Sequence, residues 1–377
     1  MNVRPAVDDI LIIGGGIAGL AAAVALRAAG AAVDVVERDD RPEGASIGLT
    51  GRAVDALDEL GLLEDCAARG NVLHGTVFDR MYDAEGTPLP VPPMPPPPGG
   101  TGRPGAVVIH RAELADILRT HALRAGARLR TRTTVTALER HPAHVNVTFT
   151  DGSEGVYGLV VGADGVGSWT RGQIHEDLEP QYTGHMSLRW LVPDVSDSRP
   201  GFYHGPQGTV IFGLLPPRTV YVSTGCDHPR THVGDEEARA LLRGRLAQYK
   251  APFVREIAER LTDDAIVLAR PYEWILVPQP WHRGRVTLIG DAAHATTAHL
   301  SSGGGMALED AAVLGQEIAR AATVAEALDR FAARRADRVR NVVETSVELM
   351  RMEREHAGPR AMGKVRGEAL GALSAPY

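Results

Sequence analysis

Residues 9–37, DILIIGGGIAGLAAAVALRAAGAAVDVVE, decide the fold expected for this chain. A short apolar strand over residues 9–13 leads into a glycine-rich turn at residues 14–19. A helix rich in alanine and leucine then extends to Ala29 and is followed by Gly30. A second apolar strand over residues 32–36 ends in Glu37. This order of strand, turn, helix and strand predicts the first βαβ unit of a parallel sheet.

The glycine spacing within this unit indicates a dinucleotide site. We expect Gly14 to make the tight turn, Gly16 to let the backbone approach a pyrophosphate, and Gly19 to let helix and strand pack closely. Glu37 comes 18 residues after Gly19, near the distance expected for the acid that binds a ribose hydroxyl. The pattern favours a dinucleotide over a glycine-rich turn without ligand, but it does not separate NAD from FAD.

A second glycine-rich stretch, GDAAHATTAHLSSGGGMALEDA at residues 290–311, favours a flavin. An apolar strand over residues 286–289 ends at Gly290-Asp291, and a triple glycine precedes a helix expected to open at Met306. Unpaired N–H groups before a helix attract negative charge, and a carboxylate at Asp291 can accept hydrogen bonds from ribityl hydroxyls. The alternative is a glycine-rich active-site loop for another ligand.

A third motif lies between these two. Residues 159–171, LVVGADGVGSWTR, form an apolar strand that ends in a Gly-Ala-Asp-Gly turn containing Asp164 and Gly165. Upstream, residues 107–111 lead into a helix expected over residues 112–125, with Arg111 at its start.

On these four motifs, at residues 14–19, 111, 163–165 and 290–291, the chain resembles the single-component FAD-dependent aromatic hydroxylases of the para-hydroxybenzoate hydroxylase type. The resemblance covers roughly residues 8–345. It implies resident, non-covalent FAD, reduction by transient NAD(P)H, and oxygen transfer from a flavin C4a-hydroperoxide to a small aromatic or heteroaromatic substrate. It implies no separate reductase.

The resemblance also implies individual roles. Glu37 would bind the adenosine ribose, Arg111 would lie near the pyrophosphate or ribityl, Asp164 would serve FAD and the approach of NAD(P)H, and Asp291 would bind the ribityl. The full set of expected cofactor-binding residues is Gly14, Gly15, Gly16, Ile17, Ala18, Gly19, Glu37, Arg38, Arg111, Val135, Asp164, Gly165, Asp291, Ala298, Gly303, Gly304, Gly305 and Met306.

One departure from the family pattern concerns the loop beside the flavin. Ala298 stands where relatives usually carry proline, and Ser301–Gly305 replaces the usual glycine–alanine pattern. Proline fixes φ and lacks an N–H group. We therefore expect a more mobile loop, or one shaped for an unusual substrate.

Composition narrows the class of protein. The chain has 377 residues, 44% of them hydrophobic, and a net charge of −7, which argues against a nucleic-acid partner. Two distant cysteines, Cys66 and Cys226, indicate a reducing cytoplasm rather than a disulfide framework. His294 and His299 lie five residues apart on the glycine-rich loop without a third ligand beside them, so no metal is expected. The apolar residues 10–36 are too interrupted to span a membrane, so no membrane association is expected.

The predicted fold class is α/β. A Rossmann-like, three-layer FAD-binding domain with a parallel sheet is expected at residues 1–76, 105–175 and 267–345. An antiparallel-sheet substrate domain is expected at residues 77–104 and 176–266. Within the first of these segments, residues 91–102 are rich in proline and predict a loop. A C-terminal helical tail is expected at residues 346–377, and the substrate is expected between the two domains.

Five residues are candidates for the chemistry. Arg189 would pair with a carboxylate or phenolate, and His299, as a neutral imidazole, would accept a substrate proton. A surface ion pair and a loop-fixing residue are their respective alternatives. Trp190, Tyr203 and His204 are candidate substrate contacts. Since side chains alternate along a strand, only one of Arg189 and Trp190 should face the site, and Tyr203 and His204 should likewise diverge.

Other functions remain open at this point. A flavin halogenase needs a lysine near the flavin, and the only lysines, Lys250 and Lys364, are poorly placed. A pyridine-nucleotide dehydrogenase leaves residues 290–291 unexplained. An epoxidase or reductase of the same superfamily, or a flavin-binding module without turnover, fits the motifs. Oxygen-dependent NAD(P)H consumption stimulated by substrate separates the hydroxylase from these.

Overall fold

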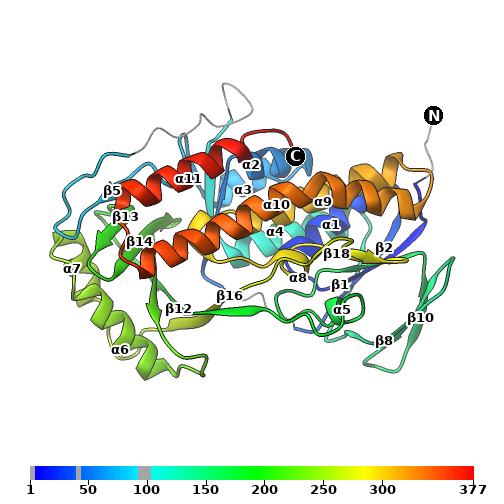
Figure 1. The fold of residues 1–377 in the computed structure, drawn as a ribbon, viewed down its shortest axis with the longest axis horizontal. Coiled ribbons are helices and arrows are strands. Elements are labelled where there is room, and N and C mark those ends of the chain that lie inside the picture. Colours follow the sequence, from blue (N-terminus) through cyan, green and yellow to red (C-terminus); the bar gives the residue numbers. More distant parts are fainter. Residues whose placement is uncertain (1–4, 40–43, 92–102) are drawn as a thin grey trace.

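The computed structural model describes residues 5–39, 44–91 and 103–377. The loop expected over the proline-rich stretch therefore lies almost wholly outside the described residues. Two six-stranded sheets lie at opposite ends of the molecule, and long helices run across both (Figure 1).

The first sheet is parallel apart from one edge strand, with the order β17-β18-β11-β1-β2-β7. Its central strands are apolar on both faces, as expected for a sheet covered on both sides. The covering layers are helices and a three-stranded antiparallel sheet, β10-β9-β8, whose inward side chains join the same core. The strands are β1 (Asp9–Ile13), β2 (Ala32–Glu37), β7 (Arg128–Thr131), β8 (Val135–Arg140), β9 (Val145–Phe149), β10 (Glu154–Tyr157), β11 (Leu159–Gly162), β17 (His282–Arg283) and β18 (Val286–Leu288).

The second sheet has the order β16-β12-β15-β14-β13-β5 and is antiparallel except between β13 and β5. Two helices cover one face and share a separate hydrophobic core with it. β16 pairs with β12, so this sheet continues to Trp274, beyond the boundary expected at residue 266. Its elements are β5 (Met81–Tyr82), β12 (Gln181–Val192), β13 (Gly201–Gly205), β14 (Gly208–Leu215), β15 (Thr219–Asp227), β16 (Val267–Trp274), α6 (Asp235–Leu246) and α7 (Pro252–Glu259).

The remaining elements connect the two sheets. α10 (Val324–Arg354) passes through the expected boundary at residue 345 and runs from the parallel-sheet end toward the antiparallel sheet (Figure 1). α9 begins at Gly303 rather than Met306, so the triple glycine forms its first turn. The others are α1 (Ile17–Ala28), β3 (Ser46–Thr50), α2 (Arg52–Glu59), α3 (Leu63–Arg69), β4 (Asn71–Leu73), β6 (Ala106–His110), α4 (Arg111–Arg124), α5 (Trp169–Gly172), α8 (Asp291–His294), η1 (Ala298–Leu300), α9 (Gly303–Arg320) and α11 (Pro359–Leu373).

Candidate active site

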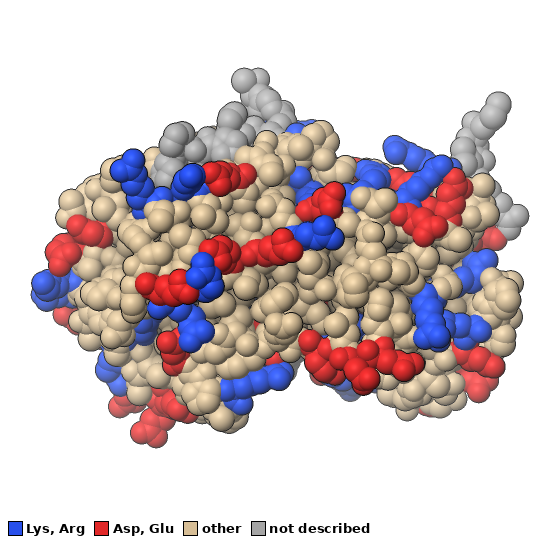
Figure 2. Space-filling view, viewed as in Figure 1, with Lys and Arg blue, Asp and Glu red and all other residues tan. Residues whose placement is uncertain are grey.

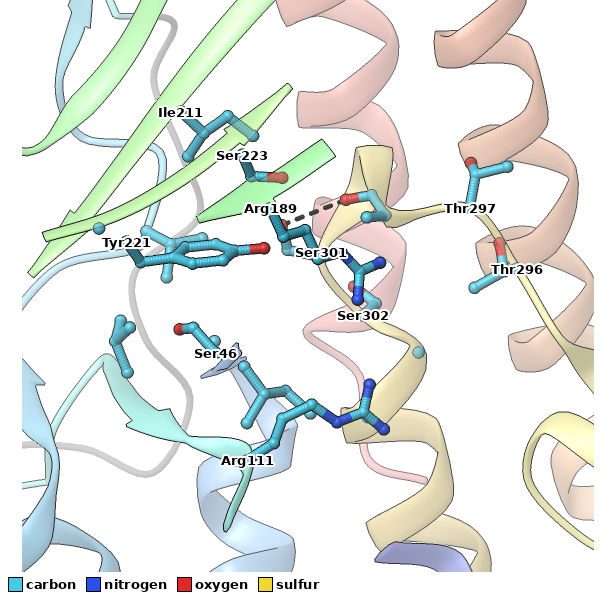
Figure 3. A pocket seen from close by; sticks show the side chains of 18 of the residues that line it. Ser46, Arg111, Arg189, Ile211, Tyr221, Ser223, Thr296, Thr297, Ser301 and Ser302 are labelled. Carbon is cyan, nitrogen blue, oxygen red and sulfur yellow. Dashed lines mark hydrogen bonds between the residues drawn. The ribbon is translucent and has the colours of Figure 1, made fainter. Parts of the chain in front are cut away.

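A cavity of about 880 Å³ lies between the glycine turn after β1 and the exposed face of the antiparallel sheet. Figure 3 shows its wall contributed by strands on one side and by the start of α9 and the loop before it on the other. Of the residues predicted from sequence, the cavity is lined by Gly16, Ile17, Ala18, Arg111, Gly165, Arg189, Asp291, Ala298, Gly303 and Gly304.

Two positions of the glycine turn, Gly14 and Gly16, carry glycine for different physical reasons. Gly14 has φ +107°, and a Cβ there would overlap the carbonyl of Ala163, which directly follows the neighbouring strand β11. Gly16 has φ −77°, and a Cβ there would meet no protein atom within 4 Å. Gly14 is therefore required by the protein's own packing, whereas Gly16 leaves space beside the cavity.

The Glu37 carboxylate holds this turn together. Gly15 N donates to Glu37 Oε2 at 2.6 Å, and Asp39 N donates to Oε1 at 2.8 Å. Each carboxylate oxygen can accept a further hydrogen bond, so Glu37 supports the turn and keeps acceptor capacity for a ligand.

The first turn of α9 supplies backbone donors to the cavity. Gly303 and Gly304 line it, and the first N–H paired within the helix is that of Met306, which donates to Ser302 O at 2.9 Å. N–H groups in a first helical turn lack intrahelical acceptors and attract negative charge. This end of the cavity therefore suits a ligand with anionic or carbonyl oxygens.

Arg111 and Asp291 bring opposite charges to the same cavity. The Arg111 side chain has no ion pair or hydrogen bond to the part of the chain that the structure describes. Burial lowers the pKa of its guanidinium, Asp291 opposes that change and Arg189 adds to it. A half-buried cation without a protein partner indicates a polar or anionic ligand.

The antiparallel sheet contributes the opposite wall. Arg189 of β12 pairs in register with Ser223 of β15, and Tyr221 lies two residues before Ser223 on the same face. Arg189 Nε donates to Ser187 Oγ at 3.0 Å, which leaves the terminal nitrogens directed into the cavity. Figure 3 shows Arg189 and Arg111 entering from opposite sides. Of the pair Arg189 and Trp190, it is thus Arg189 that faces the cavity.

His299 lies behind the cavity wall with both ring nitrogens engaged. Its Nδ1 lies 3.0 Å from Thr297 Oγ1, and that hydroxyl donates to Ser346 O, so Nδ1–H must be the donor. Its Nε2 lies 3.1 Å from Glu353 Oε2. Although burial raises the Glu353 pKa, the hydrogen bond and charge of His299 outweigh it and hold that pKa at about 2. Because both ring nitrogens are hydrogen-bonded within the protein and the side chain does not line the cavity, His299 is not placed to accept a proton from a ligand there, contrary to expectation.

The three aromatic candidates lie away from the cavity. Trp190 and Tyr203 belong to the core beneath α6 and α7, where Tyr203 stacks on Tyr82 with ring centroids 4.6 Å apart. His204 Nδ1 lies 3.2 Å from Thr209 Oγ1, and burial lowers the His204 pKa to about 4. Alternation along the strands was expected, but which face the helices cover depends on tertiary packing.

Several expected cofactor-binding residues have internal partners instead of lining the cavity. Asp164 accepts from Ser168 Oγ and from the Thr170 backbone and hydroxyl, and so shapes the turn before α5. A Cβ at Gly19 would overlap Gly14 O, and one at Gly305 would lie 2.9 Å from Ala53 Cβ, so both glycines serve packing. Arg38 pairs with Asp39 at the surface, while Val135 and Met306 are buried in the core.

The cavity also includes residues that sequence reasoning missed. They come from β3, from β4 and the residue after it, from the inner face of the antiparallel sheet, and from the loop before η1. The alternation of side chains along residues 219–224 indicates that Tyr221 and Ser223 share one face of their strand. Only the pairing of Ser223 with Arg189 shows that this face is the one that lines the cavity. The principal missed residues are Ser46, Asn71, His74, Tyr221, Ser223, Tyr272, Thr296 and Thr297.

Comparisons with known proteins agree with this geometry. The family model described as "FAD binding domain" matches residues 8–346. Aurachin C monooxygenase/isomerase of Stigmatella aurantiaca is 32% identical over 90% of this chain and 88% of its own length. The FAD-dependent urate hydroxylase of Klebsiella oxytoca is 31% identical, with 88% and 87% covered.

A solved structure extends the likeness to the whole molecule. Klebsiella pneumoniae HpxO complexed with FAD and uric acid superposes with a TM-score of 0.79 at 25% identity, covering 98% of this chain and 97% of that one. With the two-sheet architecture and the glycine turns, these matches show that the chain belongs to the FAD binding domain family and is an FAD-dependent monooxygenase.

Proposed function

We propose that this monooxygenase uses NAD(P)H and O₂ to hydroxylate a small aromatic or heteroaromatic compound that binds as an anion. Relatives support the class of substrate: they include urate hydroxylases and 3-amino-4-hydroxybenzoate 2-monooxygenase of Streptomyces cremeus. Both names denote ring compounds with acidic oxygen or nitrogen groups.

The residues present fit FAD. Arg111 is a half-buried cation with no hydrogen bond or ion pair among the described residues, Gly16 leaves open space, and the first turn of α9 presents N–H groups without intrahelical acceptors. We propose that Glu37 holds the adenosine ribose and Asp291 the ribityl chain. FAD, when bound, supplies the activation of oxygen with electrons from NAD(P)H. The chain's own residues bind and orient both ligands.

Arg189 is the observation that carries the proposed substrate class. Its guanidinium enters the cavity from the sheet, and no ion pair to it occurs within the described residues. A guanidinium fork binds a carboxylate or phenolate through charge-assisted hydrogen bonds. Tyr221 and Ser223 add polar contacts beside it. An anionic ring held here would lie against the cofactor side of the cavity.

Arg189→Gln tests this role. Losing a hydrogen bond to a charged group costs about 1.5–3 kcal/mol, so we expect KM for the activating substrate to rise roughly 10- to 100-fold, with a smaller change in kcat. The measurement is substrate-stimulated NAD(P)H oxidation across a panel of phenols, benzoates and N-heterocycles. Arg189→Lys, which keeps the charge, is the matched control. Parental KM in Arg189→Gln would contradict the anion-binding role.

We also propose a single-component enzyme of the cytoplasm with no nucleic-acid partner. Cys66 and Cys226 are free and buried, which supports a reducing compartment. Acidic and basic side chains are intermingled on the face shown in Figure 2, with no broad basic surface. Among the described helices, none is both long and apolar enough to cross a membrane.

A further inference from the structure

Behind the cavity, a buried carboxylate joins the two segments that bear the expected flavin contacts. Asp310 of α9 is fully buried, and its Oδ2 accepts from Gly290 N at 2.9 Å and from His294 Nε2 at 2.6 Å. These two donors flank Asp291 in the chain. Asp310 thus holds the short Gly290–His294 turn at both ends, while Asp291 between them lines the cavity.

The other oxygen of Asp310 is tied to the neighbouring helix. Arg335 of α10, also fully buried, donates from Nε to Asp310 Oδ1 at 2.8 Å and from Nη1 to Glu309 Oε2 at 2.7 Å. Its Nη2 donates to Met306 O at 3.3 Å, within the first turns of α9. One arginine therefore fixes the start of α9 and the carboxylate that holds the Gly290–His294 turn.

Stability alone does not account for this cluster. Buried ion pairs are commonly neutral or unfavourable relative to apolar packing of the same volume, because removing charges from water is costly. Here burial raises the Asp310 pKa, but the charges of His294 and Arg335 and three hydrogen bonds outweigh it and hold the pKa at about 2. A permanently charged, fully bonded carboxylate has one defined geometry, which is what positioning requires.

We propose that Asp310 is a positioning residue: it sets the placement of the Asp291 carboxylate relative to the N-terminal turn of α9, and so the affinity for the flavin half of FAD. The proposal rests on the proposed role of Asp291 in cofactor binding. Asp310 itself does not line the cavity.

The test is a double-mutant cycle on FAD binding to the apoprotein, followed by flavin fluorescence. Asparagine at position 310 must place an NH₂ group toward one of three donors, so Asp310→Asn leaves at least one of them unpaired. We expect the Kd for FAD to rise at least tenfold, and the Kd for ADP, which lacks the flavin and ribityl, to change less than threefold. In an Asp291→Ala background, Asp310→Asn should weaken FAD less than twofold further.

Glu317→Gln is the matched control. Glu317 is a buried carboxylate of the same helix paired with Arg334 of α10, but it has no bond to the Gly290–His294 turn. The Glu317→Gln substitution should lower the thermal midpoint of the apoprotein and leave its affinity for FAD unchanged. If Asp310→Asn fails to fold, His294→Phe removes one donor and retains a ring against Trp281; it should raise the Kd for FAD at least threefold, again only when Asp291 is present.

Two results would overturn the proposal and are distinguishable. Additive losses in the cycle would show that Asp310 acts independently of Asp291, and would leave the flavin role of Asp291 standing. Parental FAD affinity in Asp291→Ala would remove the role of Asp291 itself, and the positioning role with it.

Discussion

At the residue scale, the His299–Glu353 pair connects the loop beside the cavity to two distant elements. Glu353 lies near the end of α10, accepts from Thr209 N of β14 at 2.5 Å, and pairs with His299 of η1. Both side chains are about nine-tenths buried. Removing one partner of a buried pair leaves the other uncompensated, which is costly.

Glu353→Gln should therefore destabilise the protein by about 3 kcal/mol at pH 7. The folded-state pKa of Glu353, about 2, lies below its ordinary value of 4.5. The contribution of this group is thus fully present above pH 4.5 and is lost as the pH falls from 4.5 toward 2. Urea unfolding of parent and variant at pH 7 and pH 3 measures it: the difference should shrink at pH 3.

Glu348→Gln is the control for this experiment, because Glu348 forms an exposed ion pair with Arg351 on the same helix. Exposed pairs contribute about 0–1 kcal/mol. A difference between parent and Glu353→Gln that stays constant with pH would contradict the ionised pair.

At the element scale, the turn between β1 and α1 contains one glycine that folding requires, Gly14, and one that ligand binding is expected to require, Gly16. Gly14→Ala should cost roughly 2 kcal/mol or more in folding free energy, because φ is positive and the Ala163 carbonyl occupies the Cβ position. Gly16→Ala should leave the thermal midpoint of the apoprotein nearly unchanged and weaken FAD at least about tenfold, since its Cβ would enter ligand space. Thermal unfolding of the apoproteins and FAD titration separate the two; tight FAD binding by Gly16→Ala would place the cofactor elsewhere.

The η1 turn allows a test of loop stiffness. Thr297 is extended, with ψ 161°, as the residue before a proline prefers, and Ala298 opens η1. Ala298→Pro should therefore fold, stiffen the loop and change the hydrogen peroxide released per NAD(P)H consumed more than it changes FAD affinity. The ratio of peroxide to NAD(P)H, measured with the activating substrate, checks this. An unchanged ratio with weakened FAD binding would be the contrary result.

At the scale of the whole molecule, the sequence predicted the local elements, but it did not predict the contacts between elements that are distant in the chain. The strand at residues 9–13 and the helix after it depend on neighbours in sequence, and the structure confirms both. Alternation along the strand predicted that only one of Arg189 and Trp190 faces the site, and the structure shows that it is Arg189. By contrast, the burial of Trp190 depends on α6 and α7 packing against the sheet, and the hydrogen bond that engages His299 Nε2 depends on Glu353, 54 residues away. No local pattern contains these contacts.

The length of α10 has a mechanical consequence. Its 31 residues span about 46 Å, with Arg335 bonded to the start of α9 and Glu353 bonded to a strand of the opposite sheet. One continuous helix that is bonded to both halves, from its interior and near its C-terminal end, opposes a hinge motion that would separate them. We therefore expect ligand exchange without separation of the two halves, so a covalent link between them should leave the turnover rate almost unchanged.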